Sequence, residues 1–338
     1  MENILEVNNL CTSFYTYAGE VKAVRDVSFS LKKGDALGIV GESGSGKSVT
    51  MMSIMRLLSD NGKITDGTIT FSGTNITNLK KSELKAIRGD RIGMIFQDPM
   101  TSLNPLLTIG RQLMEPLVVH RKISKAEAEN KAIEMLKLVG IPEPERRLKQ
   151  YPHEFSGGMR QRVMIATALI CEPELVIADE PTTALDVTIQ AQILELLKDI
   201  KEKMNTSIIM ITHDLGIVAD LCDMINVMYG GTIVERGTKR DIFYNSRHPY
   251  TWGLLRSVPN PKNLIKERLK PIEGQPPNLL NPPKGCPFAA RCDYAMGVCL
   301  EKKPQGFEIS DTQVSACWLN HPDAPRIENP LLGRKNNE

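Results

Sequence analysis

Strand-length apolar runs alternate with segments of helical periodicity along most of this chain. Such alternation is typical of α/β proteins with a parallel sheet. The pattern predicts strands at residues 36–40, 64–71, 91–96, 175–178, 207–211 and 225–228, and helices at residues 49–58, 188–204 and 215–222. Gly230 and Gly231 then turn the chain into a last hairpin arm.

One long segment within this pattern carries only helical periodicity. Residues 108–120 and 125–139 place apolar side chains at i, i+3 and i+4 spacing, which predicts amphipathic helices. We therefore expect a helical insertion at about residues 99–171 within the α/β domain.

The composition changes near Arg247, and residues 259–283 are crowded with Pro, Asn and Lys, as in an extended linker. The remainder of the chain is short and bears cysteines. It is too small for a core of its own, so we expect it to need a metal centre or packing against the main domain. The predicted division is a main domain at 1–256 and a C-terminal extension at 257–338.

Composition narrows the class of protein. The chain has 338 residues, 41% hydrophobic residues and a mean hydropathy of −0.21, which predicts a soluble globular protein. No apolar run approaches the roughly 20 residues of a membrane span, and the N-terminal sequence MENILEVNNL does not resemble a signal peptide. A net charge of +2 argues against a nucleic-acid partner bound mainly through its phosphates.

The sequence GESGSGKS fits the phosphate-loop pattern G-x-x-x-x-G-K-[ST] at every position. Gly41, Gly44 and Gly46 allow the backbone to curl so that its N–H groups face an anion. Lys47 brings a positive charge to the β and γ phosphates, and Ser48 offers a hydroxyl to Mg²⁺. A strand before this loop and a helix after it favour a nucleotide site over a simple turn.

Two carboxylates follow the buried run LVIA. Asp179 is expected to help hold Mg²⁺, and Glu180 to polarise an attacking water as a general base. Gln97 and His213 each follow another apolar strand. The Gln97 amide can reach the metal or the water, and a neutral His213 imidazole can bond the γ-phosphate and Glu180. Without the other motifs, either side chain would more simply be read as solvated or structural.

A second glycine-rich turn, FSGGMRQ from Phe155, precedes another predicted helix. The phosphate loop already has a helix of its own, so this turn requires a separate explanation. With GESGSGKS before it and LVIADEP after it, the chain resembles the ATP-binding cassette (ABC) ATPases from about Leu5 to Arg256. In that family the three sequences correspond to the Walker A loop, the signature sequence LSGGQ and the Walker B strand. Phe155 and Met159 depart from the common signature residues Leu and Gln.

The resemblance implies an ABC-type P-loop fold with an antiparallel β subdomain, and ATP hydrolysis with Mg²⁺. It implies catalytic roles for Glu180, for Gln97 of the Q-loop and for the switch histidine His213, and it makes TALD (residues 183–186) the D-loop. The implied nucleotide-binding residues are Phe14, Gly41, Ser43, Gly44, Gly46, Lys47, Ser48, Val49, Ser156, Gly157, Gly158, Asp179 and Asp186. The implied Mg²⁺ contacts are Ser48, Gln97 and Asp179.

Two details of the implied site depend on geometry that the motifs do not give. An aromatic residue near Phe14 should stack on adenine; Phe14 is favoured, and Tyr15 and Tyr17 are also candidates. The signature residues Ser156 and Gly158 should cap an ATP that is held by another subunit.

The C-terminal sequences RHPYT, GLLRSVP and GCPFAARC resemble the ATPases of oligopeptide and dipeptide importers. That resemblance implies two membrane permease subunits, a second and paralogous ABC ATPase, an extracytoplasmic peptide-binding protein, and a place at the cytoplasmic face of a prokaryotic membrane. Importers of nickel, glutathione or another small solute are the alternative. A soluble ABC ATPase of DNA repair or translation is disfavoured, because this chain has one cassette and neither a coiled-coil nor a zinc insertion.

Four of the seven cysteines, Cys286, Cys292, Cys299 and Cys317, cluster in the extension. Their gaps do not match the C-x₂-C spacing of a zinc ribbon, and they suit a [4Fe–4S] cluster equally well. With the family resemblance, the order of preference is iron–sulfur cluster, zinc, free thiols and, in a cytosolic setting, disulfides last. The other three cysteines, Cys11, Cys171 and Cys222, are expected to be small buried apolar residues.

Overall fold

The computed structural model describes residues 2–183, 186–257 and 271–331. The chain divides into two compact units, of which the first comprises residues 1–5, 31–36 and 71–210, and the second residues 6–30, 37–70 and 211–338. Ala184 and Leu185 of the TALD sequence, and residues 258–270 in and before the predicted linker, lie outside the described residues.

One sheet in the second unit joins the strand predicted at 64–71 to two long strands that the apolar runs do not predict. Strand β1 (Asn3–Thr16) lies between β2 (Gly19–Lys32) and β4 (Gly62–Phe71). In β2, Val27 and Phe29 are buried while their neighbours are more exposed. This alternation marks a strand with one buried face, so neither β1 nor β2 contains a continuous apolar run.

The second unit also holds the strand that leads into the phosphate loop. Strand β3 (Ala36–Val40) is buried throughout and pairs in parallel with β9 (Met224–Tyr229). Strand β10 (Thr232–Thr238) returns antiparallel to β9, with Gly230 and Gly231 in the turn at φ values of 54° and 79°. The predicted hairpin arm is therefore confirmed.

The C-terminal extension adds two short strands beside β10. The strands β11 (Phe307–Glu308) and β12 (Val314–Ser315) pair antiparallel, and β12 pairs with β10, which gives the order β11-β12-β10-β9-β3. The helices of this unit are α1 (Lys47–Ile54), α9 (Leu215–Leu221), α10 (Lys239–Asn245), α11 (Pro249–Arg256) and α12 (Gly297–Glu301), with 3-10 turns η3 (Ala289–Arg291) and η4 (Trp318–Asn320).

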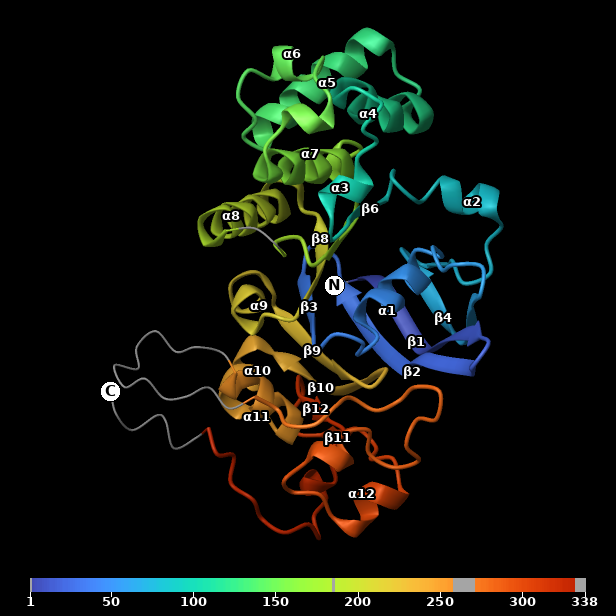
Figure 1. Cartoon of the computed structure of the whole chain (residues 1–338), viewed down its shortest axis with the longest axis vertical. Helices are drawn as coiled ribbons and strands as arrows, with labels where there is room; N and C mark the ends of the chain where they lie inside the picture. Colours follow the sequence, from blue (N-terminus) through green and yellow to red (C-terminus); the bar gives the residue numbers. More distant parts are fainter. Residues whose placement is uncertain (1, 184–185, 258–270, 332–338) are drawn as a thin grey trace, which may run out of the picture. The chain divides into compact units, whose positions relative to one another are not determined.

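In the first unit, strands β6 (Ile92–Ile95), β7 (Leu175–Asp179) and β8 (Ser207–Thr212) follow one another in the sheet, with β6 and β7 parallel. Helices α4, α5, α6 and α7 gather at one end of this unit (Figure 1). The remaining elements are β5 (Thr74–Asn75), α2 (Lys81–Lys85), α3 (Pro99–Ser102), α4 (Ile109–Pro116), η1 (Leu117–Arg121), α5 (Lys125–Leu138), α6 (Pro144–Arg147), η2 (Pro152–Glu154), α7 (Gly157–Leu169) and α8 (Val187–Met204).

Two predicted helices end differently from the prediction. The helix expected at 108–120 is α-helical only to Pro116 and then widens into the π-helical turn η1. Proline has no N–H to donate and its ring crowds the preceding turn, so the regular hydrogen-bond ladder is interrupted there. The helix expected at 49–58 ends at Ile54, because Arg56 takes a left-handed conformation with a φ of 52°.

Within residues 2–183, 186–257 and 271–331, none of the helices has both the length and the apolar character needed to cross a membrane.

Candidate functional site

The phosphate loop joins β3 to α1 in the second unit, and its glycines are required by the backbone. Gly41, Gly44 and Gly46 have φ values of 155°, 77° and 100°. A Cβ on Gly41 would lie 2.2 Å from the carbonyl oxygen of Met228, and one on Gly46 would lie 2.7 Å from that of Ala23. The loop is thus held in one curled shape by close backbone neighbours.

The lysine of the loop is buried within it. The Lys47 ammonium donates to the carbonyl oxygens of Gly41 and Glu42, at 2.7 and 2.9 Å, and the side chain is 5% exposed. Ser43 and Ser48, by contrast, are exposed, while Val49 is half-buried. The charge is therefore fixed beside a solvent-facing loop at the start of a helix, an arrangement that suits phosphate.

The three candidate aromatic residues for adenine differ in their surroundings. The Phe14 ring is half-buried, and a Cβ on Gly62 would lie 2.7 Å from one of its carbons. The Lys63 ammonium lies over the Tyr15 ring, 5.8 Å from its centroid. Tyr17 is fully exposed. Phe14 is thus less exposed than Tyr15, which is 48% exposed, and Tyr17.

In the first unit, the end of β7 presents the two predicted acids. Asp179 is buried, and the next residue, Glu180, takes a left-handed conformation with a φ of 47°. The carboxylate of Glu180 accepts hydrogen bonds from the Gln97 amide at 3.1 Å and from the Thr183 hydroxyl at 2.9 Å. The structure thus brings together Gln97 and Glu180, and the uncommon backbone turn directs the acid away from the strand.

A buried glutamine that sequence reasoning missed connects the Walker B segment with the signature helix. Gln161 on α7 is 2% exposed, and its amide donates to the carbonyl oxygen of Pro181. The available signal was a polar residue on the buried face of an otherwise apolar helix, since such a residue needs a partner. Gln161 fixes the loop after Glu180 to the helix that begins at the signature.

The signature turn lies at the start of α7. The Ser156 hydroxyl accepts from the Met159 N–H at 3.3 Å and caps the helix. Ser156 and Gly157 are exposed, and a Cβ on Gly157 would meet nothing within 4 Å. A Cβ on Gly158 would instead lie 3.2 Å from Ile189 of α8. Among the described residues, the turn is therefore open at Ser156 and Gly157 and packed against α8 at Gly158.

The two departures from the common signature have local explanations. Phe155 is buried, and the Arg147 guanidinium lies 5.7 Å from its ring centroid, so the ring serves as a core residue. Met159 contributes its backbone N–H to the cap, which any residue except proline would allow.

The last two predicted nucleotide residues lie at the ends of elements. Asp186 caps α8 by accepting from the Ile189 N–H at 3.0 Å. His213 is exposed and follows β8 directly.

The RHPYT sequence is a packing motif. Buried His248 caps α11 by accepting from the Tyr250 N–H at 3.1 Å, and burial lowers its pKa to about 3, so its imidazole is neutral. The buried Glu235 carboxylate accepts from the N–H groups of Arg247 and His248 and from the Gln313 amide. Burial raises the pKa of Glu235 to about 7.

The four cysteines of the extension lie near one another, and their thiols are free. Burial, and to a smaller extent the charges of neighbouring cysteines, raise the pKa of Cys286 and Cys292 to about 11 and that of Cys317 to about 12. The Cys286 N–H also donates to the Cys299 carbonyl at 2.7 Å.

The sequence predicts an iron–sulfur cluster or a zinc ion at these four cysteines. Among the described residues, no group of three or more His, Cys, Asp or Glu side chains is placed to hold a metal ion. The described residues therefore show neither a zinc site nor an iron–sulfur site at these four thiols.

Comparisons with known proteins match both parts of the chain. A family model described as "ABC transporter" matches residues 24–183, and one described as "Oligopeptide/dipeptide transporter, C-terminal region" matches residues 234–299. The chain is similar to the dimeric structure of the cassette MJ0796 bound to ADP and Pi, with a TM-score of 0.63 and 31% identity over 70% of this chain and 99% of that one. This likeness confirms the predicted ABC-type fold.

Curated relatives are similar over nearly the full length. The oligopeptide transport ATP-binding protein OppD of Bacillus subtilis (strain 168) is 58% identical over 97% of this chain and 92% of its own length. The dipeptide transport ATP-binding protein DppD of the same organism is 58% identical over 94% and 95%. OppD of Salmonella typhimurium is 56% identical over 93% of each. The chain therefore belongs to the family of ATP-binding subunits of oligopeptide and dipeptide ABC transporters.

Proposed function

We propose that this chain is the ATP-hydrolysing subunit of an importer for oligopeptides or dipeptides. The observation that carries the proposal is 58% identity with relatives named for oligopeptide and for dipeptide transport, at 97% and 94% coverage of this chain. In addition, the family model that matches residues 234–299 is described as the C-terminal region of an oligopeptide/dipeptide transporter.

The chemistry assigned to the chain starts with the phosphate loop. Lys47 and the backbone N–H groups that follow Gly41 bind the β and γ phosphates. Ser48 and Asp179, with Gln97, hold Mg²⁺, which when bound neutralises charge on the phosphates.

Hydrolysis is assigned to the carboxylate at the end of β7. Glu180 takes a proton from the attacking water as a general base, and the Gln97 amide that bonds this carboxylate orients it. His213 and Asp186 complete the assigned set, and Phe14 stacks on the adenine.

The signature turn is assigned to a neighbour's ATP. Ser156, Gly157 and Gly158 offer the open start of a 13-residue helix, to which negative charge is attracted. A second ABC ATPase, a paralogue of this chain, supplies that ATP. The two domains close on the nucleotide and reopen after hydrolysis, and the helical segment at 99–171 passes this motion to two membrane permeases.

The chain is placed by this proposal at the cytoplasmic face of a prokaryotic membrane, where an extracytoplasmic binding protein delivers the peptide. Nickel, glutathione or another small solute is the alternative cargo, because the cargo is selected by the partners. Uptake by a strain that lacks this gene decides between them: peptides of graded length should enter only when the gene is restored. Restored nickel uptake with unchanged peptide uptake would overturn the cargo assignment.

Glu180→Gln tests the catalytic assignment. The variant should bind ATP as the wild type does, because the amide keeps the volume of the carboxylate, and should hydrolyse it about 100-fold or more slowly, because it cannot accept a proton. Lys47→Ala is the comparison variant, in which binding itself should weaken. Near-normal turnover of the assembled Glu180→Gln transporter would contradict the role of Glu180.

The proposal extends to a [4Fe–4S] cluster on Cys286, Cys292, Cys299 and Cys317. It is supported by the burial of Cys286, Cys299 and Cys317 and by the effect that the four cysteines have on one another's pKa values, which requires them to be close together. Zinc is the alternative centre. Protein purified without oxygen should contain iron and inorganic sulfide and show the broad visible absorption of such clusters, and Cys299→Ser should lose both. Protein with neither metal would leave the four residues as free thiols.

A further inference from the structure

Glu42, the second residue of the phosphate loop, is contacted through each of its polar groups. Its N–H donates to the Tyr250 hydroxyl at 2.8 Å, and its carbonyl oxygen accepts from the Lys47 ammonium at 2.9 Å. Its carboxylate receives two parallel bonds from Arg291 of the extension, at 2.6 and 3.1 Å. Glu42 thus contacts both the lysine of the loop and the C-terminal part of the chain.

All five N–H groups of the Arg291 guanidinium donate hydrogen bonds. A guanidinium has five N–H groups, and Glu42 receives two of them. The other three go to the Tyr229 hydroxyl at 3.1 Å and to the carbonyl oxygens of Ile272 and Glu273, at 2.9 and 2.8 Å. Since the Arg291 side chain is 5% exposed, its charge has Glu42 as its anionic partner in place of water.

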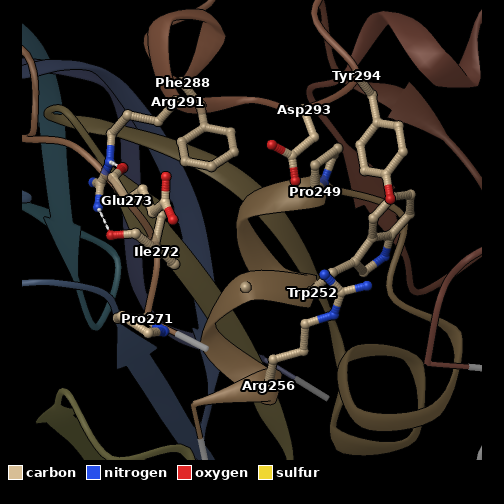
Figure 2. A pocket seen from close by; sticks show the side chains of 11 residues that line it. Pro249, Trp252, Arg256, Pro271, Ile272, Glu273, Phe288, Arg291, Asp293 and Tyr294 are labelled. Atoms are coloured by element: carbon tan, nitrogen blue, oxygen red, sulfur yellow. Dashed lines mark hydrogen bonds between the residues drawn. The ribbon is translucent and has the colours of Figure 1, made fainter. Parts of the chain in front are cut away.

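Aromatic rings enclose the same guanidinium. Its carbon lies 5.7 Å from the ring centroid of Tyr229 and 6.0 Å from that of Phe288. The ring of Tyr250 packs against both, with centroid distances of 4.5 and 5.3 Å. Figure 2 shows Arg291 bonded to the 272–273 backbone at one side of a pocket of about 730 Å³.

The place of Arg291 in the chain connects this contact with the cysteines. It ends the 3-10 turn η3 and is followed directly by Cys292. Cys286 precedes this turn, and its carbonyl oxygen accepts from the N–H of Ala289, the first residue of the turn, at 3.1 Å. The path of the chain from Cys286 to Cys292 therefore determines where the guanidinium lies.

A carboxylate within a phosphate loop opposes the binding of a triphosphate unless its charge is neutralised. Arg291 supplies that neutralisation in a bidentate geometry that lysine cannot reproduce. Tyr250 meanwhile takes the N–H of Glu42 and fixes the loop on its other side.

We propose that Arg291 and Tyr250 are positioning residues for the phosphate loop, so that the folded cysteine segment sets the loop's affinity for ATP. The proposal rests on the assigned role of the loop in binding ATP. It gives the extension a part in the nucleotide cycle that does not require it to touch the nucleotide.

The test is the affinity of the purified full-length chain for MgATP, measured by calorimetry. Arg291→Gln should weaken binding on the order of tenfold, because the Glu42 carboxylate is left without its counter-charge. In the assembled transporter the same variant should raise the KM for ATP more than it lowers kcat. Glu42→Gln combined with Arg291→Gln should return the affinity to near the wild-type value, since no charge then needs neutralising.

Lys303→Gln is the matched control. Lys303 also joins the extension to the rest of the second unit, through an exposed ion pair with Asp26 at 3.2 Å, but it does not contact the loop. Its affinity for ATP should be unchanged. An equal loss in Lys303→Gln and Arg291→Gln would overturn the proposal, since any loosening of the extension would then have the same effect.

Further variants keep the test decisive if Arg291→Gln does not fold. Tyr250→Phe keeps the ring and loses only the hydroxyl, and it should weaken ATP binding several-fold; Arg291→Lys should lie between wild type and Arg291→Gln. Wild-type affinity in folded Arg291→Gln, or in both Tyr250→Phe and Arg291→Lys, would overturn the inference. A wild-type chain that does not bind ATP would instead overturn the proposed function.

Discussion

The phosphate loop of the second unit and the signature turn of the first are both rich in glycine, and both open a helix, yet they are built in opposite ways. In the loop, Gly41 is forced by its φ and by the backbone of Met228, and Lys47 is held inside by carbonyl oxygens. In the turn, a Cβ on Gly157 would meet none of the described residues within 4 Å. In the loop, glycine is needed for the backbone conformation. In the turn, glycine leaves the start of the helix accessible.

The loop also receives support that the turn lacks. Glu42 is bonded by Tyr250 and by Arg291, both far away in sequence. Within the described residues, the start of the turn is held by its own helix cap, Ser156 to Met159. The predictions below test this contrast in order of their expected effect on stability.

Gly41→Ala should have the largest effect. The added methyl group would overlap the Met228 carbonyl oxygen in a conformation that alanine rarely adopts, so we expect about 3 kcal/mol or more of lost unfolding free energy, with loss of ATP binding. Urea denaturation and calorimetry with MgATP measure both. Gly44→Ala is a suitable control, because its Cβ would meet nothing within 4 Å although its φ is also positive.

The support of the loop by the C-terminal part should depend on pH through Glu235. Its folded pKa of about 7 lies above the usual 4.5, so its contribution to stability is fully present below about pH 4.5 and is lost as the pH rises through 7. The slope should reach about 1.4 kcal/mol per pH unit within that window. His248 titrates near pH 3, below the window.

Glu235→Gln should remove that slope, because an amide does not titrate. Denaturation midpoints followed from pH 5 to pH 8 provide the measurement. An unchanged slope in the variant would show that another group is responsible.

Ser156→Ala should cost about 1 kcal/mol of unfolding free energy, the usual value of a helix cap, because the Met159 N–H loses its acceptor. Thermal denaturation of the purified chain measures the loss. Ser156→Asp restores an acceptor and should regain most of it; failure to do so would indicate that the hydroxyl stabilises something other than the helix.

Gly157→Val should have the smallest effect on stability, within about 0.5 kcal/mol, and ATP binding by the isolated chain should not change. Turnover by the assembled transporter should nevertheless fall on the order of tenfold, because the side chain would fill the space reserved for a neighbour's nucleotide. Unchanged turnover would refute the idea that the turn serves another subunit.

Local patterns predicted much of the architecture. The buried strands β3 and β7 and the helix α5 match their predicted ranges within one residue, because continuous apolar runs and helical spacing are recorded in adjacent residues. The proximity of Gln97 and Glu180 was also expected, since each follows a strand of the same parallel sheet.

The features that the sequence could not reveal depend on contacts between distant residues. Arg291 and Glu42 are 249 positions apart, and neither has a neighbour in sequence that signals the pair. The strand β12 is two residues long, which is too short for any periodicity, and it exists because β10 offers it a partner.

That short strand gives the C-terminal segment a protective role. Strand β10 is seven residues long, and β12 pairs with two of them, Glu235 and Arg236, on the side that would otherwise be an edge of the sheet. With the segment in place, the outermost strand is the two-residue β11, a length that offers little to an incoming strand. We therefore expect a chain shortened at the boundary predicted near residue 256 to expose this edge of β10 and to self-associate more readily than the full chain.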